Sequence, residues 1–422
     1  MYQFRDRAAR ALRAALYKVL LNHHEHLNVI EGDLMKVAVI GAGLMGPTIS
    51  MDCLGSPDVS EVLLIDIDQA RLDQVSASLN SSKLRTLVQD VKDRRGLADS
   101  LKGYDATAIA LLEPLNNHAI WGAIDAGSHV VDLSFPLSED VEAINREAKR
   151  REVTVMPGCG VEPGLTDVLA AHSMDKLDRV KTIDIWCGGI PQDPKPPLDY
   201  KIVFGGPYLP LHPGAVKVIE GGSECNVQRY TLGDPPVFEG IDRPLECFYD
   251  GFPDTLELLP KFRDVKRCTE KTVRYAGYCQ KVNFLNECGL LSREPISIKG
   301  ANIAPFEAFS KIIHPKVRME TDEKDITVLR VIVEGEKDGR WASYSFDMVD
   351  RYDEEKKVTS MAKTTAYPAA IVTRMLGRGD IRERGFVPPV KAIRGDLLKQ
   401  LLDELAKRGV TIKQVSCRSD IF

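Results

Sequence analysis

Three glycines followed by an acid are the residues of this chain whose types and spacing most clearly indicate chemistry. Gly41, Gly43 and Gly46 follow an apolar run at residues 37–40, and Asp66 ends a second apolar run 20 residues beyond Gly46. Glycines at this spacing permit a tight turn, a close approach of the backbone to a pyrophosphate, and close packing of the next helix on the strand. The free N–H groups of that helix favour phosphate. The turn expected to bind a dinucleotide comprises Gly41, Gly43, Leu44, Met45 and Gly46.

Asp66 predicts which dinucleotide this turn binds. An acid at this position can accept hydrogen bonds from the hydroxyls of the adenosine ribose. Its charge would repel a 2′-phosphate, so the sequence favours NAD over NADP as the cofactor. The alternative is a Gly-rich turn that binds no nucleotide, but the pattern of strand, turn, helix, strand and acid is complete here.

Acid–base residues follow three later strand-like runs. Ligands of an open α/β sheet bind beyond the carboxyl ends of its strands, so these residues should face the nicotinamide. Glu162, in a Gly- and Pro-rich turn, could act as a general base, or could only be a charge that stabilises the start of the next helix. Asp132 could equally brace a loop, and Cys159 could only fill space in the core. Glu113, Pro114 and Ser134 complete the expected cofactor-binding set.

The middle of the chain supplies candidates for substrate binding. A lysine or arginine there could bind a substrate carboxylate, and a histidine could carry a proton. Each candidate also has an ordinary structural role. The lysine could simply be a solvated surface residue, the arginines could form ion pairs on a sheet, and the threonines could cap a helix locally. The candidates are Lys201, His212, Arg229, Arg274, Tyr275, Thr364 and Thr365.

The elements that must position these residues alternate between strand and helix up to residue 156. Apolar strands are predicted at 37–40, 62–65, 86–91, 106–112, 129–133 and 153–156, with helices between them. This alternation predicts an α/β fold with a Rossmann doubly wound parallel sheet at residues 35–163. Residues 164–354 read as an α+β domain with a largely antiparallel sheet and a hairpin turn at Asp338-Gly339. Residues 355–422 are expected to return as helices to the Rossmann domain, and residues 1–34 to form a helical extension.

Composition narrows the classes of function. The chain has 422 residues, is 44% hydrophobic, and carries a net charge of −5. A chain of this net charge lacks the excess of Lys and Arg that is typical of proteins that bind nucleic acid or anionic membranes. Nine cysteines without a CxxC pair are typical of a reduced, cytoplasmic protein. No functional metal is expected, because His23, His24 and His26 are too close together in the chain to surround one ion easily.

Five longer segments carry a resemblance to a known family. They are VAVIGAGLMG, GCGVEPGLTD, WCGGIPQDPKPPLDYK, KTVRYAGYCQKVNFLNECGLL and KTTAYPAAIVTRMLGRGDIRERGFVPP, which run from Val37 to Pro389. The chain resembles the saccharopine dehydrogenase family, and within it the L-lysine 6-dehydrogenase branch. The resemblance implies a Rossmann domain with an inserted domain that provides the substrate pocket and dimer contacts. The substrate residues that it implies are Asp132, Cys159, Glu162, Lys201, Tyr275 and Thr365.

The resemblance also implies an activity. The expected reaction is the NAD-dependent oxidative deamination of the ε-amine of L-lysine to aminoadipate semialdehyde, which cyclises, and ammonia. The expected partners are a small amino-acid substrate and further copies of the chain in a homo-oligomer. A saccharopine-type dehydrogenase that acts on a secondary amine is the first alternative. The second is a non-catalytic protein that senses NAD.

Overall fold

The computed structural model describes residues 34–204, 209–320 and 322–418. Met35–Phe422 form one compact unit. The predicted N-terminal extension and its histidines lie outside the described residues, apart from Leu34. Within those described ranges, no helix is both long and apolar enough to cross a bilayer.

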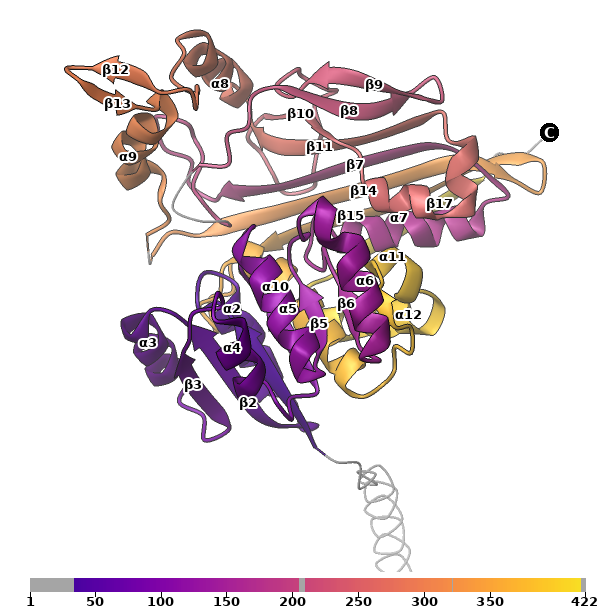
Figure 1. Ribbon diagram of the computed structural model, residues 1–422. Coiled ribbons are helices and arrows are strands. Elements are labelled where there is room, and N and C mark those ends of the chain that lie inside the picture. Colours follow the sequence, from indigo (N-terminus) through magenta and orange to yellow (C-terminus); the bar gives the residue numbers. More distant parts are fainter. Residues whose placement is uncertain (1–33, 205–208, 321, 419–422) are drawn as a thin grey trace, which may run out of the picture. The chain divides into compact units, whose positions relative to one another are not determined.

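The first sheet has seven parallel strands in the order β16-β6-β5-β4-β1-β2-β3. This order, with β1 at the centre and a crossover to either side, is that of a doubly wound dinucleotide-binding sheet. It confirms the predicted α/β fold with a Rossmann sheet (Figure 1). The seventh strand, β16, comes from the far end of the chain and was not predicted. The strands are β1 (Met35–Ile40), β2 (Val59–Asp66), β3 (Leu84–Val88), β4 (Ala106–Ile109), β5 (His129–Asp132), β6 (Thr154–Met156) and β16 (Gly385–Phe386).

Helices cover both faces of this sheet because its central strands are apolar on both sides. Val37 and Val39 of β1 pack into one cluster, and Ala38 and Ile40 pack into another on the opposite face. Successive side chains of a strand point to opposite faces, so each face takes every second residue. The helices between the strands are α2 (Gly46–Leu54), α3 (Gln69–Leu79), α4 (Arg94–Ser100), α5 (Leu115–Ala126) and α6 (Val141–Arg150), with a short 3-10 turn, η2 (Ser138–Asp140), before α6.

The second sheet is mixed. Its strands run in the order β17-β15-β14-β7-β11-β8-β9, and β10 pairs with β11. Most pairs are antiparallel as predicted, but β7 and β11 are parallel. The predicted hairpin at Asp338-Gly339 joins β14 to β15, and both turn residues have the positive φ that such a turn requires. The strands are β7 (Arg179–Pro191), β8 (Ala215–Glu220), β9 (Ser223–Gln228), β10 (Leu245–Gly251), β11 (Arg267–Tyr275), β14 (Asp325–Lys337), β15 (Arg340–Arg351) and β17 (Lys413–Arg418).

Smaller elements surround the second sheet. Helix α7 (Leu165–Lys176) packs against β14, β7 and β15. Two 3-10 turns precede β11, and a separate two-stranded sheet stands beside two further helices (Figure 1). These elements are η3 (Asp254–Leu258), η4 (Pro260–Asp264), α8 (Tyr278–Glu287), β12 (Ile296–Ile298), β13 (Ala301–Ile303) and α9 (Pro305–Val317).

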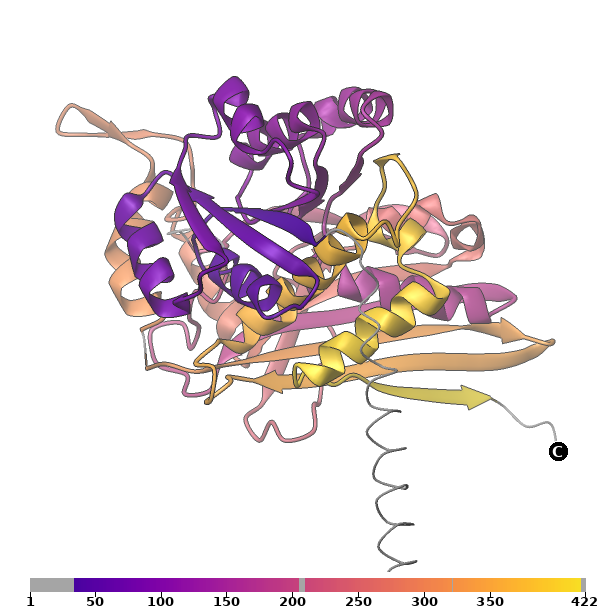
Figure 2. The ribbon, with the colours of Figure 1, turned by 90° about the horizontal axis from the view of Figure 1, so that it is seen from below.

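Helix α10 (Ser360–Gly377) connects the two sheets. It contacts α2, β1, β4 and β5 on one side and β14 and β15 on the other (Figure 2). Its apolar residues belong to one core cluster with side chains from both sheets, such as Val39 and Val331. The segment after it is not only helical, because β16 joins the first sheet and β17 pairs with β15. The remaining C-terminal helices are α11 (Pro389–Ala392) and α12 (Gly395–Lys407).

Candidate active site

A cavity of about 610 Å³ lies between the carboxyl ends of the first sheet and the face of the second sheet. The Gly-rich turn and the residues after β4, β5 and β6 line one side of it. Strands β7, β10 and β11 line the other side, and α10 contributes Met361 and Thr365. The cavity therefore meets the strand ends at which an open α/β sheet binds its ligands.

The Gly-rich turn has the shape that a dinucleotide needs. A Cβ at Gly46 would lie 1.7 Å from the carbonyl oxygen of Gly41, and one at Gly41 would lie 2.6 Å from that of Ala110. Both positions therefore exclude any side chain. A Cβ at Gly43 would meet no atom within 4 Å, so the space above this residue is open. These residues fit a pyrophosphate lying on the turn at the start of α2.

Asp66 stands at the end of β2 with its carboxylate held in place. It accepts a hydrogen bond from the N–H of Ala42 at 2.7 Å and another from the N–H of Asp68 at 3.0 Å. Asp66 also lines a second cavity of about 170 Å³, together with Gly41 and Gln89. This is where the adenosine of a dinucleotide would lie, with Asp66 close to its ribose.

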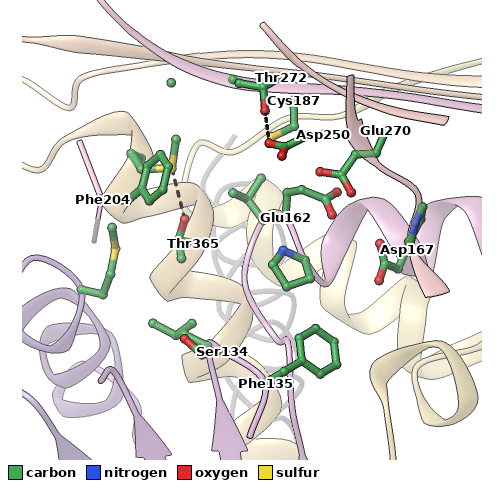
Figure 3. A pocket seen from close by; sticks show the side chains of 18 of the residues that line it. Ser134, Phe135, Glu162, Asp167, Cys187, Phe204, Asp250, Glu270, Thr272 and Thr365 are labelled. Carbon is green, nitrogen blue, oxygen red and sulfur yellow. Dashed lines mark hydrogen bonds between the residues drawn. The ribbon is translucent and has the colours of Figure 1, made fainter. Parts of the chain in front are cut away.

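Glu162 and Glu270 form a pair of carboxyl groups inside the main cavity. Figure 3 shows them pointing toward each other, with Asp167 close by. Burial raises the pKa of Glu162 well above its ordinary value, and the charges of Glu270 and Asp167 raise it further. Burial, and then the charge of Asp167, raise the pKa of Glu270 to about 7. Two acids that close cannot both ionise easily, so the pair retains a proton at neutral pH.

The local chain explains why Glu162 points into the cavity. Its turn is held by Gly158 and Gly164, both with positive φ. A Cβ at Gly164 would lie 2.7 Å from backbone atoms of Gly158 and Gly160, so only glycine closes this turn. One carboxyl oxygen of Glu162, Oε2, is buried without a hydrogen-bond partner among the described residues. Buried polar atoms usually have partners, so this oxygen is available to a ligand.

Asp132 and Cys159 do not line the cavity. Asp132 is fully buried and accepts hydrogen bonds from Ser134 N–H at 3.0 Å and from the Asn116 amide at 2.8 Å. Burial raises its pKa to about 7. Burial and the charge of Asp132 raise the pKa of the Cys159 thiol to about 12, so it is not a thiolate at neutral pH. Asp132 acts as a brace for the loop that places Ser134.

The other predicted cofactor residues divide between the cavity and the surface. Gly43, Leu44, Met45 and Ser134 line the cavity. Glu113 and Pro114 are exposed and lie away from its lining. No group of three or more His, Cys, Asp or Glu side chains within the described part of the chain could hold a metal ion.

Of the predicted substrate residues, Arg274 and Thr365 line the cavity. Tyr275 donates to the carbonyl of Pro191 at 2.8 Å, and Thr364 donates to that of Ser360 at 2.9 Å. His212 is exposed. Tyr275, Thr364 and His212 therefore lie outside the lining of the cavity.

Two of the three predicted carboxylate-binding cations already have carboxylate partners. Lys201 pairs with Glu323 at 2.8 Å and donates to the carbonyl of Arg318 at 3.1 Å. Arg229 pairs with Asp250, which does line the cavity. The prediction of Lys201 as the group that receives a substrate carboxylate is not supported by this geometry, because its charge is already compensated.

Several cavity residues were not predicted as site residues. They are mainly acids from helix α7 and from the second sheet, which only the folded chain brings next to Glu162. The sequence signal that was available is the alternation of β11, which places Glu270, Thr272 and Arg274 on one face of the strand. The missed residues are Asp167, Asp250, Asp254, Glu270 and Thr272.

Two family models match this chain and together cover most of it. The model of the saccharopine dehydrogenase NADP binding domain matches residues 37–156, and that of the saccharopine dehydrogenase C-terminal domain matches residues 160–410. The chain belongs to the saccharopine dehydrogenase family. This confirms the predicted membership of the family, and with it the prediction that the protein is a dehydrogenase with a dinucleotide-binding domain; the branch within the family stays a prediction.

Similar proteins extend over most of the chain. The carboxyaminopropylagmatine dehydrogenase of Synechocystis is 22% identical over 83% of this chain and 91% of its own length. The saccharopine dehydrogenase [NADP(+), L-glutamate-forming] of Saccharomyces cerevisiae is 21% identical over 90% of this chain and 98% of its own. The solved structure of apo saccharopine dehydrogenase (L-Glu forming) from this yeast aligns with a TM-score of 0.73, at 19% identity, over 91% of this chain and 100% of that one. At this identity the structural likeness supports the fold.

Proposed function

We propose that this family member is an NAD-dependent L-lysine 6-dehydrogenase, which converts the ε-amine of L-lysine to an aldehyde and releases ammonia. The observation that carries the proposal is the surplus of carboxyl groups in the cavity. Its lining contains five acids, Glu162, Asp167, Asp250, Asp254 and Glu270, and one cationic side chain, Arg274. A pocket of this charge favours a substrate with positively charged nitrogens.

The pair of Glu162 and Glu270 supplies the proton acceptor. A substrate amine enters as an ammonium ion and must lose a proton before a hydride can leave the neighbouring carbon. A pKa near 7 for Glu270 suits this task, because the group can accept a proton and then release it at neutral pH. The cofactor, when bound, accepts the hydride from the substrate carbon. Water then adds to the substrate imine, ammonia leaves, and the aldehyde cyclises.

The position of Asp66 supports NAD as the cofactor. Its carboxylate, fixed by two backbone N–H groups, would face a 2′-phosphate at the ribose of NADP. This repulsion would be absent with NAD, whose ribose hydroxyls can donate to the carboxylate. The NADP-binding description of the family model leaves the choice within the family open, and Asp66 supports NAD for this chain.

A saccharopine-type reaction is the second candidate, favoured by the names of the relatives. Its substrate carries three carboxylates, and the lining offers them one cationic side chain, Arg274, among five acids. The charge of the cavity therefore supports lysine over saccharopine.

The deciding experiment measures NADH formation and ammonia with L-lysine, saccharopine and ornithine as substrates. Lysine-dependent NADH with an equal amount of ammonia is the expected result. NADH with saccharopine, accompanied by glutamate and no ammonia, would replace the proposal with the second candidate. Clear NAD binding without turnover of any substrate would instead favour a sensor of NAD.

A further inference from the structure

Buried cations in this protein almost always have a carboxylate beside them. Five described Lys and Arg side chains are less than one-tenth exposed, and in four of them the charge is compensated by an acid. The exception is Arg274, which is 4% exposed and forms no ion pair with any described residue. The compensated pairs are Lys201–Glu323 at 2.8 Å, Lys271–Asp184 at 2.9 Å, Lys363–Asp350 at 3.1 Å and Arg374–Asp52 at 3.3 Å.

Arg274 is held in place without being neutralised. Its guanidinium carbon lies 4.5 Å from the ring centre of Tyr200 and 5.7 Å from that of Tyr278. One terminal nitrogen donates to the carbonyl of Val273 at 2.8 Å, whereas Nε has no hydrogen-bond partner within the described ranges. Aromatic rings can orient a guanidinium and attract it weakly, but they do not replace an anion.

The side chain is also open to the catalytic cavity. Arg274 lines it, as do Glu270 and Thr272 of the same strand. Residues two apart on a strand point to the same face, so all three share one wall. Four residues of a strand span about 13 Å, which separates the carboxyl pair from the guanidinium along this wall. Burial, and then the charge of Glu270, raise the pKa of the Cys187 thiol, whereas the charge of Arg274 lowers it, so both charges act on this wall of the cavity.

We propose that Arg274 is the centre of a carboxylate-binding subsite, and that it makes this cavity select amino acids with a basic side chain over diamines. A buried guanidinium without an acid is costly unless a ligand supplies the anion, and its fork of donors matches a carboxylate. The acid pair at the other end of the wall then receives the side-chain amine. This assignment rests on the proposed function, since it names how the lysine is oriented.

The test compares two ligands that differ in one carboxylate. L-Lysine and 1,5-diaminopentane share the carbon chain and the amine to be oxidised, and only lysine can engage Arg274. Calorimetry on protein saturated with NADH measures both affinities without turnover. The wild type should bind lysine on the order of 30-fold more tightly than the diamine, the range expected for a charged hydrogen-bonded contact.

Arg274→Gln should remove this preference by weakening lysine binding, with the diamine little changed. Arg274→Lys keeps the positive charge but loses the paired N–H donors of the guanidinium, so it should retain part of the preference. If Arg274→Gln does not fold, the comparison of wild type with Arg274→Lys serves as the test. The control is Arg243→Gln, which removes one exposed arginine and should alter neither affinity. A wild-type preference that survives in both Arg274 variants would overturn the subsite.

A third ligand separates this inference from the proposed function. Hexanoate has a carboxylate but no nitrogen, so its binding does not depend on amine oxidation. If lysine is neither bound nor oxidised, hexanoate binding that is lost in Arg274→Gln would still support the subsite. Equal hexanoate binding by wild type and variant, or none by the wild type, would reject it.

Discussion

Glu270 should destabilise the folded protein at neutral and alkaline pH, and removing its charge should therefore strengthen the fold. Burial is the largest cause that raises its pKa, from an ordinary 4.5 to about 7. A folded-state pKa above the unfolded value means that the folded protein binds more protons between these two pH values. The free energy of unfolding then falls as the pH rises through this window. Raising this pKa from 4.5 to about 7 corresponds to about 3 kcal/mol of stability, lost in full above pH 7.

The variant Glu270→Gln keeps the size of the side chain and removes its titration. At pH 8 its free energy of unfolding should exceed that of the wild type by up to about 3 kcal/mol, and at pH 4.5 the two should differ little. Guanidinium unfolding followed by tryptophan fluorescence at both pH values measures the difference. The same variant should lose turnover if the pair is the proton acceptor.

A matched control is Glu294→Gln, which removes the charge of an exposed acid. Its stability relative to the wild type should be the same at pH 4.5 and pH 8. If Glu270→Gln is no more stable than the wild type at pH 8, burial of the Glu270 carboxylate does not lower the free energy of unfolding, and the prediction is wrong.

Three further predictions concern catalysis and cofactor choice. Glu162→Gln should lower kcat by roughly 100-fold or more while the Kd for NAD stays within about twofold, and unchanged turnover would remove Glu162 from the mechanism. The wild-type kcat/KM for lysine should fall about tenfold per pH unit below pH 7, where Glu270 takes up its proton; a flat rate from pH 5 to 8 would contradict this. Asp66→Ser should raise the ratio of NADP to NAD use, as measured by the two kcat/KM values, and a ratio that does not move would place Asp66 away from the ribose.

The parts of the fold that local patterns encode could be predicted from the sequence. The glycine spacing and the alternation of apolar strands with helices indicated the first sheet, because each βα unit has its own turn and its own periodicity. Strand β16 could not be found in this way, because a strand of two residues, Gly385–Phe386, has no period. The parallel pairing of β7 with β11 was missed for a related reason: these strands lie far apart in the chain, and their pairing has no local signature.

The candidate site was predicted mainly on the side of the first sheet. Glu162 and Ser134 follow strands of the first sheet, so a topological rule located them. Glu270 comes from β11, which carries polar side chains on both of its faces, and only the packing of the two sheets shows which face meets the cavity. Lys201 shows another limit of sequence reasoning, since the acid that compensates its charge, Glu323, lies over a hundred residues further along the chain.

The position of α10 has a consequence for synthesis on the ribosome. This helix covers the apolar face of β1, β4 and β5, yet roughly 200 residues separate it from β6, the last strand of the N-terminal series. At about 5–20 residues per second, that face should stay uncovered for roughly 10–40 s while the chain is made. A gene fragment that ends after β6 should therefore give an aggregating product, and a nascent chain of this length should be a target for chaperones. This face should be covered only after Ser360–Gly377 has been made and has left the ribosome.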